Sequence, residues 1–174
     1  MERLENGWAD SVREAVIQKA LSFVGREAVP RTSNRVIFNT DYHGREVSGD
    51  EYPWCVTFLW DVFRMAGCSQ CFFGGEKTDE CTDLLRWGTE NGLLVDKIDV
   101  RRGDLAFYSW DGSPIPEHVG LVLERKEDGG FLAVEGNTSE VCDPDGGRVM
   151  IRPRKPEWTV AVLRPQYGCA EKEL

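Results

Sequence analysis

Residues 53–66 read PWCVTFLWDVFRMA, and this stretch decides the fold of the chain. A proline fits the first turn of a helix, and Gly67 follows as a stop signal. The apolar residues fall on nearly every side of the predicted helix, and a helix that is apolar all round is buried. We therefore expect residues 53–66 to form the central helix of the domain, with Cys55 in its first turn.

The position of Cys55 bears on its chemistry. The N–H groups of a first helical turn have no partner within the helix, and with the helix dipole they favour the thiolate, the nucleophilic form of cysteine. Tyr52 and Trp54 are candidate substrate-binding residues, because their rings would shape a cleft wall beside the sulfur. The alternative for Cys55 is a small buried hydrophobe, since free cysteine is among the most buried residue types.

The segments on either side of this helix predict further helices. An earlier helix is expected to begin at Ser11, where SVRE has the capping-box pattern, and to stop at Gly25. Residues 26–52 are polar and predict a long loop that leads to the central helix. A third helix is expected over residues 78–90.

After residue 104 the pattern changes to short apolar runs bounded by Gly, Pro and Asp. Such runs predict an antiparallel sheet of about five strands. The runs are 105–108, 118–124, 131–135, 149–151 and 160–163. Helices first and strands after predict an α+β fold with the helices packed on one face of a C-terminal sheet. The expected divisions are an N-terminal extension (1–9), one catalytic domain (10–165) and a C-terminal tail (166–174).

His118 begins the predicted strand that reads HVGLV, and it is one of two histidines in the chain. A thiol on a helix start and an imidazole on a strand are the parts of a Cys–His hydrolase. With Cys55 as its partner, His118 would act as general base toward the thiol and then as general acid toward the leaving amine. The alternative is a solvated histidine at a strand start. Gly120 permits the close approach of a substrate or another backbone.

The third group of such a site would hold the imidazole in the right tautomer, and two residues qualify. If strands 118–125 and 130–137 pair as a hairpin, Glu135 and Asn137 both lie on the face of the sheet that carries His118. Either register is compatible with a turn between Lys126 and Gly130. The geometry therefore narrows the choice to these two residues and leaves it open. The alternative for Glu135 is a solvent-facing strand residue.

Four segments in order give the chain a family resemblance. They are WCVTF (54–58), RGDLAFY (102–108), HVGLV (118–122) and EGNT (135–138). Together they resemble the CHAP amidase/peptidase family, a relative of the NlpC/P60 and papain-like cysteine peptidases, over residues 10–165. The resemblance implies a papain-like fold. Some members of the family carry an acidic calcium loop before the cysteine, but Asp41 and Asp50 are too sparse here for such a site, so we expect no metal and no cofactor. It also favours Glu135 as the third catalytic residue, with Asn137 assisting nearby.

The function that the resemblance implies is cysteine-dependent hydrolysis of peptidoglycan, as in phage endolysins and other enzymes of cell wall degradation. The bond would be the N-acetylmuramoyl–L-alanine amide or a peptide bond of the stem or cross-bridge. Two alternatives stay open. One is another Cys–His amide hydrolase or acyltransferase that acts on a non-wall substrate, and the other is a non-catalytic module that binds wall peptides.

Composition and charge narrow the partners. The chain has 174 residues and a net charge of −9, which argues against nucleic acid and anionic membranes, because both need a basic footprint. The first residues lack the apolar stretch of a secretory signal, and no run of 18 or more apolar residues exists. We expect a monomer that is made in the cytoplasm without a signal peptide. It would act at the bacterial cell wall after lysis or specialised export.

The six cysteines are too few, in too long a chain, for a disulfide scaffold. They lie at positions 55, 68, 71, 81, 142 and 169. Apart from Cys55, we expect reduced structural thiols that catalysis does not need. Cys68 and Cys71 have metal-ligand spacing and Cys81 follows them, but zinc normally takes four ligands and no adjacent fourth is visible. A zinc site or a redox pair is the alternative. Asp104 is expected to serve as a turn carboxylate.

Overall fold

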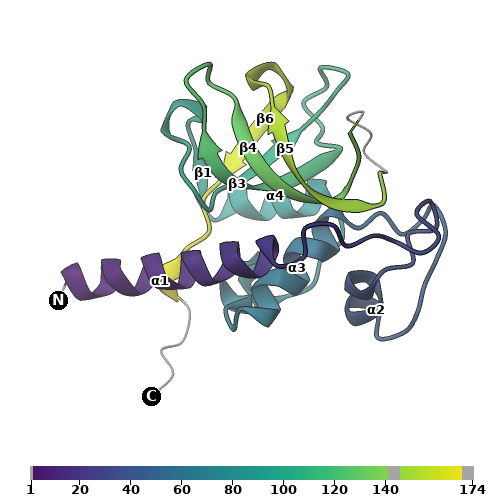
Figure 1. Ribbon diagram of the computed structural model, residues 1–174. Coiled ribbons are helices and arrows are strands. Elements are labelled where there is room, and N and C mark those ends of the chain that lie inside the picture. The colour runs from purple at the N-terminus through teal and green to yellow at the C-terminus, as the bar shows by residue number, and fades with distance from the viewer. Residues whose placement is uncertain (1, 141–145, 170–174) are drawn as a thin grey trace.

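The computed structural model describes residues 2–140 and 146–169, and it has the expected α+β architecture (Figure 1). Four α-helices come first in the described chain: α1 (Glu2–Leu21), α2 (Ile37–His43), α3 (Cys55–Met65) and α4 (Cys81–Glu90). Six strands follow: β1 (Leu94–Val95), β2 (Leu105–Tyr108), β3 (His118–Arg125), β4 (Phe131–Thr138), β5 (Arg148–Arg154) and β6 (Thr159–Leu163). They form one antiparallel sheet in the order β1-β6-β2-β3-β4-β5.

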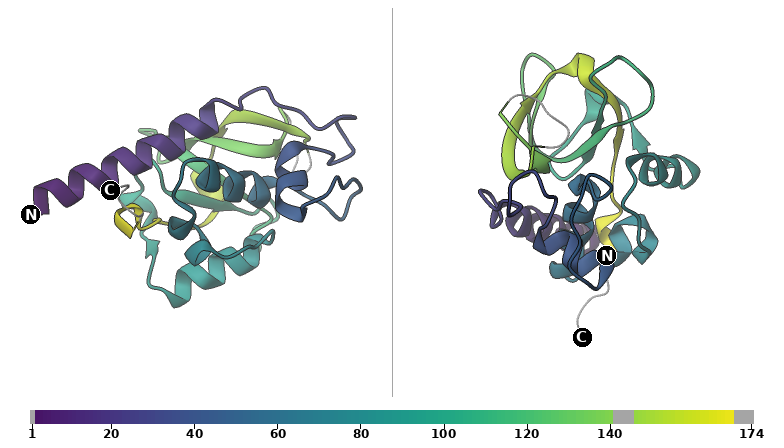
Figure 2. Two further views of the ribbon diagram at one scale, coloured as in Figure 1. Left: turned by 90° about the horizontal axis from the view of Figure 1, so that it is seen from below. Right: turned by 90° about the vertical axis from the view of Figure 1, so that its right-hand side faces the viewer.

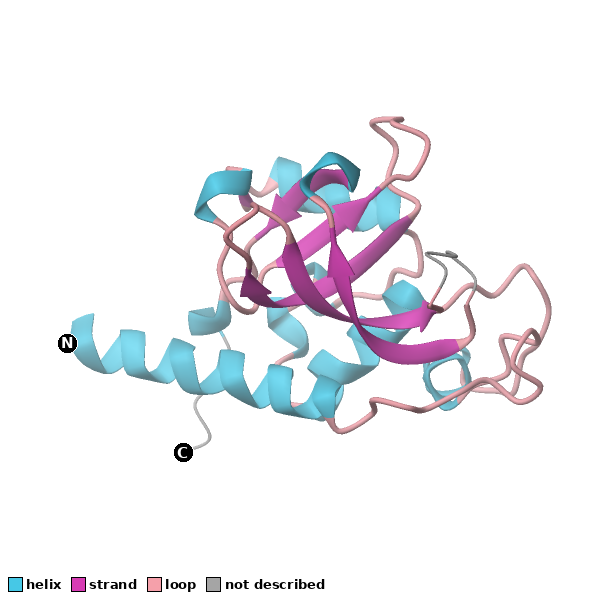
Figure 3. Cartoon of the chain, turned by 45° about the horizontal axis from the view of Figure 1, so that its top comes forward, coloured by secondary structure: helices cyan, strands magenta, loops and turns pink. Residues whose placement is uncertain are grey.

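The sheet has two unequal faces. Helix α1 and helix α3 lie under one face, and α3 contacts β3 and β4 directly (Figures 1 and 3). The larger hydrophobic cluster fills this layer and includes Leu105 and Phe107 of β2. The intervening residues of β2, Ala106 and Tyr108, belong to a smaller cluster on the opposite face. Side chains of a β-strand point alternately to the two faces of its sheet, so β2 contributes buried residues to both clusters.

Helix α3 is the central helix, as the sequence predicts. The view from below in Figure 2 shows it crossing beneath the sheet beside α1. Gly67 has a φ of 73°, the left-handed conformation that commonly ends a helix. Gly136 of β4 explains how closely α3 approaches the sheet, because a Cβ atom there would lie 2.6 Å from the Cβ atom of Phe58. Glycine is therefore required at position 136 for this packing.

Several element boundaries differ from the sequence predictions. Helix α1 begins at Glu2 and not at Ser11, whose hydroxyl instead donates to the carbonyl of Trp8 within the helix. Residues 2–9 continue α1 because most of them are good helix formers. The expected loop 26–52 contains the short helix α2, and the third helix begins at Cys81. Strand β1 was missed because two residues are too few to show a period.

The end of the described chain packs onto the domain. Tyr167 is buried, and its hydroxyl donates to the carbonyl of Gly103 at 2.6 Å. Next to it, Asp104 accepts a hydrogen bond from the Arg101 N–H and pairs with Arg164, which confirms its structural role. Among the described residues, no helix is both long and apolar enough to cross a membrane.

Candidate active site

The candidate site forms where the helical layer meets the start of strand β3. Cys55 is the first residue of α3, and His118 is the first residue of β3, opposite Tyr108 of β2. Alternation along β3 puts His118 on the face of the smaller cluster, whereas Cys55 arrives from the helical side. Both residues are buried. The structure therefore brings together two residues that are 63 positions apart in the sequence.

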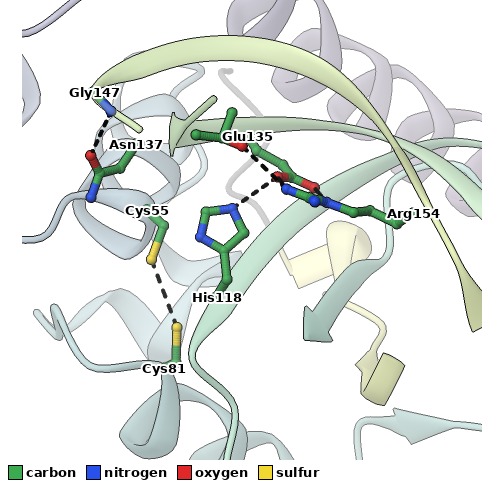
Figure 4. A network of polar contacts seen from close by, with 8 residues as sticks. Cys55, Cys81, His118, Glu135, Asn137, Gly147 and Arg154 are labelled. Carbon is green, nitrogen blue, oxygen red and sulfur yellow. Dashed lines mark hydrogen bonds and ion pairs between the residues drawn. The ribbon is translucent and has the colours of Figure 1, made fainter. Parts of the chain in front are cut away.

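The imidazole of His118 lies between a carboxylate and a thiol. Its Nε2 atom is 2.8 Å from Oε2 of Glu135, and both side chains have no exposed surface. Its Nδ1 atom has no nitrogen or oxygen partner in the described part of the chain, and it is turned toward Cys55 (Figure 4). The ring is thus held on one side while its other nitrogen faces the sulfur.

Asn137 occupies a different position. The pairing of Leu121 with Val134 continues to a register in which position 137 faces His118. Asn137, however, has a φ of 54°, and its Oδ1 atom accepts a hydrogen bond from the Gly147 N–H at 3.1 Å. Figure 4 shows this amide beside Gly147, away from the pair formed by Glu135 and Arg154. Of the two residues that strand alternation predicts on the same face as His118, Glu135 is the one within hydrogen-bond distance of Nε2.

Gly120 makes the approach of Glu135 possible. A Cβ atom at position 120 would lie 2.7 Å from Cγ of Glu135 and 3.0 Å from its Oε1 atom. The close approach predicted for Gly120 therefore involves the carboxylate side chain of the neighbouring strand.

Arg154 completes the site, and none of the sequence motifs includes it. Its Nε atom donates to Oε1 of Glu135 at 2.8 Å, and its Nη2 atom contacts the other carboxylate oxygen and Thr138. The guanidinium lies over the rings of Tyr108 and Trp110, 5.4 and 4.8 Å from their centroids. Arg154 is 2% exposed despite its charge. Its place on the inward face of strand β5 is the one signal that could have indicated it.

The charges of this site are coupled. Burial by itself lowers the pKa of His118, but the negative charge of Glu135 and hydrogen bonds with Cys55 and Glu135 raise it to about 9. Burial raises the pKa of Glu135, but Arg154 and His118 together hold it below its usual range. These directions favour a row of alternating charges: thiolate, imidazolium, carboxylate and guanidinium. The row has no net charge, which limits the cost of burying it.

Cys81 lies against Cys55, a contact that no spacing in the sequence indicates. The two Sγ atoms are 3.8 Å apart, and Cys81 is the first residue of α4 as Cys55 is of α3 (Figure 4). The hydrogen bond from Cys81 is the main reason that the pKa of Cys55 lies well below its usual value; the interaction with His118 also lowers it, and burial opposes both. The same contact and burial raise the pKa of Cys81 well above its usual value.

The remaining described cysteines form a separate group. Cys71 and Cys169 have their Sγ atoms 3.7 Å apart, and the Cys68 thiol donates to the carbonyl of Phe63. All the described cysteines are free thiols, and Cys142 lies outside the described residues. In residues 2–140 and 146–169, no three His, Cys, Asp or Glu side chains are grouped to hold a metal ion. The Cys68–Cys71–Cys81 grouping considered from the sequence is not formed, because Cys81 packs against Cys55.

The aromatic residues around Cys55 need one correction. Trp54 is fully buried and stacks on Phe38 with ring centroids 5.6 Å apart, so it supports the start of α3 and does not line an open cleft. Tyr52 is partly exposed, and its ring lies 5.1 Å from that of His43. Trp110 is also partly exposed, with its ring centroid 6.1 Å from that of His118. Of these three aromatic residues, Tyr52 and Trp110 are the ones with exposed surface.

The chain was compared with known protein families and with curated proteins. The family model of the CHAP domain matches residues 47–137, which is just over half of the chain. The matched segment contains Cys55, Cys81, His118, Glu135 and Asn137, and Arg154 lies beyond it. No curated protein matches the chain.

Proposed function

The chain belongs to the CHAP domain family of the papain-like cysteine peptidase and amidase group, and from this premise we propose that it hydrolyses an amide bond of peptidoglycan. The family itself indicates a peptidoglycan-related amidase or peptidase activity. The observation that carries the proposal is the buried line from Cys55 through His118 to Glu135.

In the first half of the proposed reaction, the Cys55 thiolate attacks the carbonyl carbon of the scissile amide. The negative charge that develops on the carbonyl oxygen is stabilised by the N–H of Cys55 at the start of α3, together with a nearby side chain. His118 gives its proton to the leaving amine, which departs and leaves a thioester on Cys55. The thiolate and imidazolium forms favoured in the resting site are the forms that this step requires.

In the second half, water attacks the thioester. His118, now neutral, accepts a proton from the water, and the thiolate leaves as the acid product forms. Glu135 keeps the ring oriented through both steps by its contact with Nε2. Arg154 is a positioning residue in this scheme, because its hydrogen bonds fix the carboxylate and favour its charged form.

We propose peptidoglycan as the substrate on the strength of the family, with two candidate bonds. These are the N-acetylmuramoyl–L-alanine amide and a peptide bond of the stem or cross-bridge. The proposed place of action is the bacterial cell wall. A net charge of −9 gives no general attraction to anionic wall polymers, so recognition would depend on contacts close to the site, with Tyr52 and Trp110 as candidate substrate-binding residues.

The test is the digestion of purified peptidoglycan from several bacteria, with mass spectrometry of the soluble products. The expected products are muropeptides with one newly formed amine and one new carboxylate, and their masses identify the bond. Cys55→Ala is the matched control, because it removes a sulfur and leaves the helix start intact. It should retain less than about a hundredth of the activity, and an unchanged circular dichroism spectrum would show that the fold is kept.

Two results would count against the proposal. If the Cys55→Ala variant released as much product as the wild type, Cys55 would not be the nucleophile. Binding of the wild-type protein to intact peptidoglycan without any product, from every source tried, would favour a non-catalytic module.

A further inference from the structure

We propose that Cys55 and Cys81 form a reversible disulfide bond, so that a peroxide converts the site to a protected resting form and a thiol reductant restores it. The effect on hydrolysis rests on the proposed function, but the bond itself does not. The observation that carries the inference is the contact between the two Sγ atoms at 3.8 Å (Figure 4).

The contact brings together two helix starts. Cys55 opens α3 and Cys81 opens α4. For Cys55 this position favours the thiolate, which is the form that reacts with peroxides, whereas Cys81 stays a thiol and can donate its proton. Both residues are buried, with 6% and 7% of their surface exposed, so a small oxidant is favoured over a large one.

The geometry allows the sulfurs to close on each other. A disulfide needs a sulfur–sulfur distance of about 2.0 Å, so the pair must approach by roughly 1.8 Å. Residues 76–80, which precede Cys81, belong to no helix or strand, and they can take up the shift without breaking a regular element. The first residue of a helix also moves more easily than one in its middle.

The chemistry is a two-electron oxidation in two steps. The Cys55 thiolate attacks one oxygen of the peroxide; an S–O bond forms, the O–O bond breaks, and the leaving hydroxide takes a proton from His118 to become water. The sulfur of Cys81 then attacks the Cys55 sulfenic acid; an S–S bond forms, the S–O bond breaks, and the hydroxide leaves as water with the Cys81 proton. An added dithiol reverses the change and is itself oxidised to a disulfide.

The consequence is protection of the nucleophile. A sulfenic acid without a neighbouring thiol is oxidised further to sulfinic and sulfonic acids, which a thiol does not reverse. With Cys81 in contact, the sulfenic acid has a partner before a second peroxide molecule arrives. The resulting disulfide blocks attack on a substrate until it is reduced.

The chain contains a matched comparison in its second thiol pair. Cys71 and Cys169 are equally close, at 3.7 Å, but burial and the neighbouring Cys71 raise the pKa of Cys169 to about 11. The Cys55 thiol, with its lowered pKa, should therefore react first. If proximity alone decided the outcome, the two pairs would be oxidised at the same rate.

The experiment uses the full chain, reduced and then treated with stoichiometric hydrogen peroxide. Free thiols are blocked with iodoacetamide before digestion with trypsin. Cys55 falls in the tryptic peptide 46–64, Cys81 in 78–86, Cys68 and Cys71 together in 65–77, and Cys142 in 127–148. The expected major product is peptide 46–64 linked to 78–86, lost on treatment with dithiothreitol. It should appear before any link that involves peptide 65–77.

The control variant is Cys81→Ser. With at least three equivalents of peroxide per thiol, this variant should convert Cys55 to sulfinic and sulfonic acids. Dithiothreitol should then not restore a free thiol that iodoacetamide can alkylate. A variant with Cys68, Cys71, Cys142 and Cys169 replaced by serine keeps the proposed pair and should still form the link. If either variant fails to fold, the peptide map of the wild-type protein still decides.

The inference is overturned if Cys55 of the wild-type protein becomes sulfinic acid while Cys81 remains alkylated, or if Cys55 links mainly to another cysteine. Hydrolysis of peptidoglycan before and after dithiothreitol is recorded in parallel. Absence of hydrolysis in the untreated protein, together with the expected peptide link, would defeat the proposed function and leave the disulfide established.

Discussion

At the scale of single residues, Glu135 and Asn137 have different partners, although strand alternation predicts the same face of the sheet for both. Glu135 bonds to Nε2 of His118, whereas Asn137 bonds through Oδ1 to the backbone of Gly147. Glu135→Gln should therefore lower the turnover number by about a hundredfold or more, because the amide does not favour the imidazolium. Asn137→Gly should lower the turnover number by less than about tenfold, and glycine tolerates the positive φ of this position.

The measurement must separate orientation from stability, because Glu135→Gln also leaves the buried Arg154 without its counter-charge. Loss of one partner of a buried ion pair costs about 3–5 kcal/mol. The rate of Cys55 alkylation by iodoacetamide as a function of pH makes the distinction. Its midpoint should move to higher pH in the folded Glu135→Gln protein and stay in place in Asn137→Gly. The opposite ranking would transfer the orienting role to Asn137.

At the scale of elements, the contact between α3 and β4 positions the nucleophile against the sheet. Gly136 lies on β4, where a Cβ atom would come 2.6 Å from Phe58 and 3.0 Å from Trp54. Gly136→Ala should lower the free energy of unfolding by about 1–3 kcal/mol, the usual cost of overpacking, and should lower turnover because α3 must shift.

The control for this prediction is Gly7→Ala in α1, where a Cβ atom would meet no atom within 4 Å. It should raise the stability by up to about 1 kcal/mol, since alanine is the better helix former. Chemical denaturation of both variants gives the comparison. A Gly136→Ala protein as stable and as active as wild type would show that the packing of α3 on β4 does not position Cys55.

At the scale of the whole molecule, the buried row of charges links folding to pH. The pKa of Cys55 lies well below its usual value, so the thiolate contributes stability that is fully present above the unfolded pKa of about 8.5. That contribution is lost as the pH falls through the folded pKa. The contribution of His118 to stability depends on pH in the opposite direction. Because its pKa is raised, this contribution is present below about pH 6.5 and is lost as the pH rises through about 9.

Comparison of wild type with Cys55→Ala isolates the thiolate contribution. The difference in unfolding free energy between the two proteins should increase as the pH rises from about 5 to about 8, by at most ~1.4 kcal/mol per pH unit. Urea denaturation at several pH values in a reducing buffer measures it. A difference that stays constant over this range would show that Cys55 is protonated in the folded protein.

The sequence by itself determined the features that depend on local pattern. The all-round apolar run at 53–66, the short apolar strands after residue 104 and the alternation along them predicted the α+β class, the central helix and the face shared by His118, Glu135 and Asn137. Tertiary structure decided the rest, because periodicity specifies a face but not which side chains on it make contact. A positive φ turns Asn137 toward Gly147. Arg154 reaches Glu135 from the neighbouring strand, and α4 brings Cys81 to Cys55 across 26 residues, contacts that no local pattern encodes.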